Sequence, residues 1–233
     1  MGGQAPFVAG PAPRGALRPD DGRLERGRRT RARIREAARA LFRECGFDRT
    51  TLRAIASRAG MGASSLYRHI RSKEELLVDE LQELQEQAWR RYRARAPRDR
   101  PALERLQELL DLEHQLLARD PDLTTIALRA TTHPEARVAR QVLALQDRTV
   151  GLIAEVLLQG RTRGELQPQV DVLAAARTIA HTTNGARIAW ANGLLDAEGC
   201  RAAIRTAVAV LFRGIAPPAV ASEPPCEGRG GAG

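Results

Sequence analysis

Polar and basic side chains gather between Ser64 and Lys73, where their types and spacing suit the binding of phosphate groups. The stretch reads SSLYRHIRSK, and Lys73 is the only lysine of the chain. It directly follows Ser72 and opens a leucine-spaced run. A flexible ammonium binds an anion without the fixed fork of a guanidinium, and a helix N-terminus already favours an anion. We therefore interpret Lys73 as a phosphate-binding residue at the start of a helix.

Positive charge is concentrated around this stretch. Residues 28–71 hold 12 arginines and three acidic residues, a net charge of +9, which equals the net charge of the whole 233-residue chain. A solvated arginine-rich face is the simpler alternative. A general bias toward arginine, however, would not leave the rest of the chain with a net charge of zero. The distribution favours a surface that binds a polyanion.

The elements that must position these residues are predicted to be helices. Aromatic residues are 3% of the chain, and Ala, Leu, Arg and Glu are abundant, which favours helices over sheets. Apolar residues from Ile34 to Phe42 follow a helical period in a helix that Thr30 caps and Gly46 ends. Two short helices follow at 52–59 and 63–70, separated by a glycine-containing turn. Ser72 to Glu75 form an S-x-x-E capping box that opens a long helix.

The remainder of the chain is predicted to be helical between two tails. Residues 1–27 and 217–233 are rich in Gly and Pro without periodicity, so we expect disorder there, with a basic N-terminal tail. A turn is expected at 120–122. Further helices are expected at 102–118, 123–131, 134–159, 172–191 and 197–213, with Gly160 ending the third of these and Asp171 and Asp196 capping the last two. The fold class is therefore all-α, with about nine helices.

A short helix pair joined by a glycine-containing turn is the helix-turn-helix unit, whose second helix enters the DNA major groove. The stretch TTLRAIASRAGMGASSLYRHIRSKEELL resembles the DNA-binding domain of the TetR (tetracycline-repressor) family of bacterial regulators. The resemblance covers about residues 28–88, with the motif at 51–70. It implies a three-helix head followed by a larger ligand-binding and dimerisation domain at 89–216.

The resemblance also implies particular contacts with DNA. The expected DNA-binding residues are Thr51, Arg53, Ala63, Ser64, Ser65, Tyr67, Arg68, His69 and Lys73. Ser65 and Arg68 are expected to meet bases, whereas Thr51, Arg53 and Lys73 are expected to meet phosphates. Tyr67 and His69 are either phosphate contacts or packing residues. Gly62 and Ser64 stand where the family usually has a serine and a glycine, which leaves the individual base contacts open.

The C-terminal part is expected to pair and to bind an effector. The resemblance implies a homodimer through helices 172–191 and 197–213, two heads on a palindromic double-stranded DNA operator, and release by a small molecule of unknown identity. Intramolecular packing of the two helices is the alternative. The candidate ligand-binding residues are Trp89, His114, Thr125, Arg129, His133, His181, Thr182, Asn184 and Trp190.

Other functions are less well supported by the sequence. A transcriptional activator, or a DNA-binding protein that does not respond to a ligand, would carry the same DNA-binding domain. A helical enzyme would need a nucleophile–base pair, a metal-ligand spacing or a glycine-rich phosphate loop, and the sequence offers none. We expect no cofactor, no metal, no membrane span and a cytoplasmic location. The arginines at 14, 18, 23 and 26 form either a solvated tail or a minor-groove arm.

Overall fold

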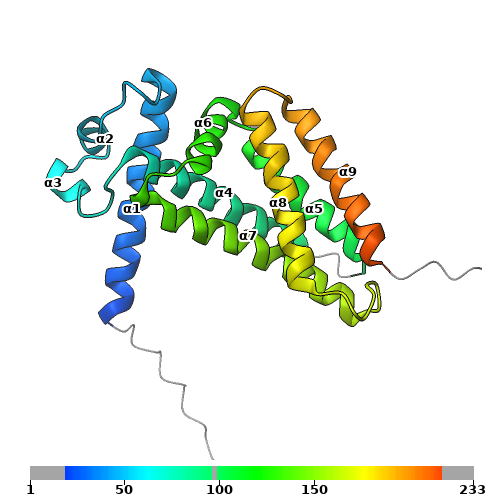
Figure 1. The fold of residues 1–233 in the computed structure, drawn as a ribbon. Coiled ribbons are helices and arrows are strands. Elements are labelled where there is room, and N and C mark those ends of the chain that lie inside the picture. The colour runs from blue at the N-terminus through cyan, green and yellow to red at the C-terminus, as the bar shows by residue number, and fades with distance from the viewer. Residues whose placement is uncertain (1–18, 96–98, 217–233) are drawn as a thin grey trace, which may run out of the picture. The chain divides into compact units, whose positions relative to one another are not determined.

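The computed structural model describes residues 19–95 and 99–216, and in these ranges the chain forms nine helices and no strand (Figure 1). The all-α fold is therefore confirmed. The predicted tail at 217–233, and residues 1–18 of the predicted N-terminal tail, lie outside the described residues. Contacts divide the chain into two compact units, one ending at His69 and the other beginning at Ile70. The expected boundary after residue 88 instead falls inside a helix that packs with the second unit.

The first unit contains α1 (Pro19–Cys45), α2 (Leu52–Arg58) and α3 (Ala63–Leu66). The predicted start of the first helix was wrong, because α1 begins at Pro19 and includes residues assigned to a disordered tail. Thr30 is not a cap: its hydroxyl donates to the carbonyl of Arg26, 2.9 Å away, within the helix.

The core of the first unit comes from the apolar stripe that the sequence predicted. Its buried residues are Ile34, Ala37, Ala38, Leu41, Phe42, Ile55, Ala56, Ala59 and Leu66. The rings of Phe42 and Phe47 lie 5.2 Å apart between centroids. The stripe places α2 against α1, and α2 in turn contacts α3. Met61, in the turn between α2 and α3, is only half-buried.

The second unit is a bundle of six helices. They are α4 (Lys73–Arg95), α5 (Ala102–Leu117), α6 (Pro121–Thr132), α7 (Ala136–Thr162), α8 (Val172–Ala191) and α9 (Ala197–Ile215). Figure 1 shows α8 and α9 side by side, and α8 also packs against α6 and α7. α4 contacts α5, α6 and α7, and α8 contacts α6 and α7. The helices α4, α5, α6, α7 and α8 therefore surround a common interior.

Helix boundaries in this unit agree with the predicted caps in two cases. Asp171 accepts hydrogen bonds from Leu173 and Ala174, and Asp196 accepts one from Gly199, which begins α8 and α9 as expected. The predicted turn at 120–122 was wrong, because Asp120 is the N-cap of α6. Pro121 is its first residue, a position where proline costs no hydrogen bond.

The predicted boundaries of α7 were also wrong. It begins at Ala136 rather than at Pro134, and it does not stop at Gly160 but continues to Thr162. Gly160 serves packing instead: a Cβ there would come within 2.6 Å of the Cβ of Ala102. Next to this contact, the Glu165 carboxylate accepts a hydrogen bond from the backbone of Ala102 and caps α5. The close approach of α7 to α5 therefore depends on a residue without a side chain.

Candidate nucleic-acid interface and internal pocket

The turn between α2 and α3 is held by backbone geometry. Thr51 caps α2 by accepting a hydrogen bond from the Ala54 amide at 3.1 Å. At the other end, Gly60 has φ +64°, and Met61 donates to the carbonyl of Ala56 at 3.0 Å. A left-handed glycine with this bond is the Schellman end of a helix. Arg33 from α1 donates to the carbonyl of Ala59, so the direction of the chain into α3 is fixed.

The recognition segment, residues 63–69, is shorter as a helix than predicted. α3 ends at Leu66, and the next residues form a turn in which Arg68 donates to the carbonyl of Ser65 and His69 to that of Leu66. These three-residue spacings are the tighter 3₁₀ pattern found at helix ends. The Gly62 cap supplies no side-chain hydrogen bond. The predicted helix over 63–70 was therefore wrong beyond its first turn.

Side chains of the recognition segment divide into an anchor and an accessible set. Leu66 is completely buried, whereas Tyr67 is 49% exposed. Arg68 is exposed and donates to the hydroxyl of Ser65 at 3.2 Å, which joins the two residues expected to read bases. Among the predicted DNA-binding residues, Thr51, Arg53, Ser64, Tyr67 and Arg68 are exposed, and Ala63, Ser65, His69 and Lys73 are half-buried.

Lys73 is the first residue of α4, as expected. The hydroxyl of Ser72 accepts a hydrogen bond from the Glu75 amide at 3.2 Å, which is one half of the predicted capping box. The Glu75 carboxylate accepts from the amide of Arg71 at 2.8 Å, rather than from that of Ser72. The return bond thus reaches one residue further back, and the helix start is still capped.

Part of the positive charge in the first unit is neutralised internally. Both terminal nitrogens of Arg58 donate to the Glu44 carboxylate, at 2.9 and 2.6 Å, and this pairing lowers the pKa of Glu44. Arg29 pairs with Glu25. The Arg58–Glu44 pair already cancels within the net charge of +9, whereas Glu25 lies outside residues 28–71 and neutralises one further arginine of the segment.

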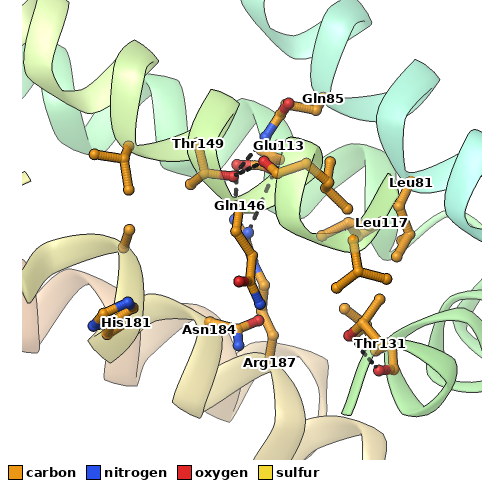
Figure 2. A pocket seen from close by; sticks show the side chains of 15 residues that line it. Leu81, Gln85, Glu113, Leu117, Thr131, Gln146, Thr149, His181, Asn184 and Arg187 are labelled. Atoms are coloured by element: carbon orange, nitrogen blue, oxygen red, sulfur yellow. Dashed lines mark hydrogen bonds and ion pairs between the residues drawn. The ribbon is translucent and has the colours of Figure 1, made fainter. Parts of the chain in front are cut away.

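The second unit encloses a pocket between α4, α5, α6, α7 and α8 (Figure 2). It contains about 710 Å³ of empty space, its open mouth included. Its apolar walls are Leu81, Leu117, Leu128, Val142, Leu145, Val150 and Ala180. A mostly apolar interior with a few polar groups is the usual composition of a small-molecule site.

A buried ion pair crosses one wall of the pocket. Figure 2 shows Arg187 of α8 reaching Glu113 of α5. The two nitrogen–oxygen distances are 3.3 and 2.8 Å, and the side chains are 8% and 11% exposed. Because the charges cancel, the ion pair adds no net charge to the pocket. Next to the pair, Gln85 of α4 donates to the hydroxyl of Thr149 of α7 at 2.7 Å.

Two of the nine predicted ligand-binding residues, His181 and Asn184, line this pocket. His114 is buried elsewhere against Trp190, with ring centroids 5.4 Å apart, and Trp89 stacks on Tyr92. Burial lowers the pKa of His114, and the positive charge of Arg187 acts in the same direction.

The other four predicted ligand-binding residues lie outside the pocket lining and make hydrogen bonds within the protein. Arg129 donates to the carbonyl of Ala191, whereas Thr125 and Thr182 donate to backbone carbonyls of their own helices. His133 lies at the end of α6 and contacts the hydroxyl of Thr132.

Sequence reasoning missed the residues that define the polar part of the pocket. Gln85, Glu113 and Arg187 lie on otherwise apolar helix faces, which was the available signal. A polar residue on such a face is either buried with a partner or displaced to the surface, and the partner here lies on another helix. The pairing therefore follows from tertiary packing and could not be found from spacing within one helix.

No group of three potential metal ligands occurs among the residues with described positions, and none of their helices is long and apolar enough to cross a membrane.

Comparisons with known proteins match both units. The family model of bacterial regulatory proteins of the tetR family matches residues 34–79, and that of the tetracyclin repressor-like C-terminal domain matches residues 99–190. The transcriptional repressor KstR of Rhodococcus jostii is 33% identical over 69% of this chain and 72% of its own. KstR2 of Mycobacterium tuberculosis is 31% identical over 66% of this chain and 77% of its own.

A solved structure is similar over most of the chain. FadR of Thermus thermophilus, a TetR-family transcriptional repressor in complex with lauroyl-CoA, is 26% identical with a TM-score of 0.64. The match covers 85% of this chain and 99% of that protein. The similarity therefore includes both the helix-turn-helix and the helices that surround the pocket.

Proposed function

Because the chain belongs to the TetR family of bacterial regulatory proteins, we propose that it represses transcription by binding a palindromic operator as a homodimer. A small, largely apolar effector in the pocket between α4 and α8 releases it from DNA. The observation that carries this proposal is the combination, in one chain, of an exposed recognition segment and an internal pocket lined mainly by apolar side chains. The protein would act in the cytoplasm, where the DNA is.

The proposed DNA contacts follow the exposure of the side chains. Thr51 uses its oxygen as a helix cap, which leaves its hydroxyl hydrogen for a phosphate. Tyr67 and Arg68 extend from the same turn that Leu66 anchors in the core. We assign Arg68 and Ser65 to base edges, and Arg53, Tyr67, His69 and Lys73 to the DNA backbone.

The proposed dimer uses the faces of α8 and α9 that do not pack inside the chain. Leu173, Leu194 and Val210 are 46%, 77% and 58% exposed, and they lie on or between these two helices. Leu173 lies at the start of α8, Leu194 follows its end and Val210 lies near the end of α9, so exposed apolar side chains are spread along the length of the helix pair. A twofold pair of these faces would form a four-helix interface and present two heads to two half-sites.

The proposed effector carries a long apolar chain, such as that of an acyl-CoA thioester. The pocket wall is mainly aliphatic, and its one buried guanidinium is neutralised by Glu113. A strongly anionic group would therefore remain at the mouth, near His181 and Asn184. The complex of FadR with lauroyl-CoA supports the same class of ligand.

The DNA-binding part of the proposal is tested by fluorescence anisotropy with the DNA that flanks the protein's own gene. We expect binding that resists random-sequence competitor, at two protomers per site. Binding no stronger than to random DNA, with one protomer per site, would contradict it. An activator would give the same binding result, and a promoter-fusion assay separates the two because a repressor lowers the reporter signal.

A further inference from the structure

A second, smaller cavity lies behind the pocket, between α4, α5 and α7. It has room for little more than one water molecule, and its apolar lining includes Ala88, Leu109, Leu110, Leu152 and Ile153. Three residues line both cavities: Gln85, Glu113 and Thr149. The two spaces are therefore neighbours separated by a thin polar wall, whose members are labelled in Figure 2.

The wall is held by hydrogen bonds between α4 and α7. Gln85 is 2% exposed, and its amide nitrogen donates to the hydroxyl of Thr149 at 2.7 Å. The hydroxyl of Thr149 donates in turn to the carbonyl of Leu145 at 3.0 Å. The amide oxygen of Gln85 accepts no hydrogen bond from any described residue. A buried amide with an unsatisfied oxygen is unfavourable for stability, so packing alone does not account for glutamine at this position.

We propose that Gln85 and Thr149 form a barrier that limits how far the apolar chain of the effector can penetrate, and so make them the residues that determine specificity for chain length. The inference rests on the proposed function of the pocket as the effector site. A methylene chain that reaches the barrier must break the Gln85–Thr149 bond without replacing it. Lengthening the acyl chain by one more methylene then leaves the affinity of the effector unchanged. In an open apolar cavity, burial of the same methylene would raise the affinity roughly fourfold.

The barrier can be removed from one side. Gln85→Ala deletes the amide and joins the two cavities, while the hydroxyl of Thr149 keeps its bond to Leu145. Ala88 is 1% exposed and lines only the inner cavity, so Ala88→Val reduces the space that the first variant makes accessible. Gln87→Ala is the matched control, because Gln87 lies on the same helix as Gln85, lines neither cavity and is half-buried.

The experiment measures the Kd of octanoyl-, lauroyl-, palmitoyl- and stearoyl-CoA by isothermal titration calorimetry. In the unaltered protein, affinity should rise with chain length and then reach a plateau within the series. In Gln85→Ala the plateau should move to a longer chain, with stearoyl-CoA binding at least tenfold more tightly and octanoyl-CoA unchanged. Gln85→Ala combined with Ala88→Val should return most of the way to the original plateau, and Gln87→Ala should leave the plateau at its original chain length.

Two results would overturn the inference, and they differ from each other. If affinity depends on acyl-chain length in the same way in Gln85→Ala and in the unaltered protein, the barrier is refuted and the pocket remains an acyl-binding site. If no thioester binds either protein, the proposed effector class is wrong, and the chain-length barrier fails with it. Thr149→Ala, which shortens the other side chain of the barrier, gives the same comparison should Gln85→Ala not fold.

Discussion

Arg68 in the first unit and Arg187 in the second lie in opposite environments. The guanidinium of Arg68 is exposed and donates to the hydroxyl of Ser65, whereas that of Arg187 is buried and donates through both terminal nitrogens to Glu113. An exposed charge is stabilised by water until a DNA phosphate or base takes the place of the water molecules. A charge in the interior depends on one partner. Substitutions at the surface should therefore change DNA binding, and those in the interior should change the stability of the fold.

The largest effect is expected from breaking the buried pair. Glu113→Ala should lower the free energy of unfolding by about 3–5 kcal/mol, because it leaves the guanidinium of Arg187 buried without its counter-charge. Urea denaturation measures this change.

The matched control for this prediction is Glu44→Ala, which breaks the exposed bidentate pair with Arg58 and should have a much smaller effect. The double variant Glu113→Leu with Arg187→Met should recover much of the lost stability. Equal losses in the exposed and buried pairs would contradict the distinction between the two units.

Removal of the exposed guanidinium should affect recognition and leave the fold intact. Arg68→Ala should weaken operator binding by about 1–3 kcal/mol and relax the base preference at one position of each half-site. Selection of bound sequences from a random library measures the preference, and the thermal midpoint should stay at its original value. An unchanged base preference would remove Arg68 from base recognition.

A smaller and less selective effect is expected at the start of α4. Lys73→Ala should weaken binding to specific and random DNA about equally, because a phosphate contact carries no sequence information. The slope of the logarithm of affinity against that of salt concentration should decrease by about one ion. Loss on the operator alone would mean that Lys73 contributes to base recognition instead.

The smallest effect concerns the pH dependence of stability. Burial lowers the pKa of His114 below its ordinary value of about 6.5. As pH falls through 6.5, His114 is protonated in the unfolded chain while it is still neutral in the folded protein. The free energy of unfolding should therefore decrease. His114→Gln should flatten this decline between pH 7 and pH 5, whereas His133→Gln at the exposed end of α6 should keep it. An identical slope in both variants would exclude His114 as its source.

The sequence was sufficient where local chemistry determines the structure. Asp171 and Asp196 are helix caps next to an apolar period, and the structure places α8 and α9 where they predict. Gly60 ends α2 because only glycine adopts its backbone angle at no cost. The start of α1 was missed because Gly22 and Gly27 suggested a tail, although neither interrupts the helix.

Tertiary packing decided what the sequence could not. His181 and Asn184 line the pocket although their helix, 172–191, was expected to form the dimer interface. Glu113 and Arg187 were missed because a charge within an apolar stripe reveals nothing about its partner 74 residues away. Gly160 was predicted to end a helix because the sequence does not show which residue packs against it. In the structure, its missing side chain lets Ala102 of α5 approach α7 closely.

The measurement that tests the central claim most directly is the release of operator DNA by an acyl-CoA, followed by fluorescence anisotropy. Lauroyl-CoA should lower the anisotropy of the complex formed by the unaltered protein. Leu145→Trp, which fills the pocket, should bind the same DNA with similar affinity and resist release by at least tenfold in lauroyl-CoA concentration. Release of both proteins at the same concentration, or of neither at any concentration, would contradict control of DNA binding through this pocket.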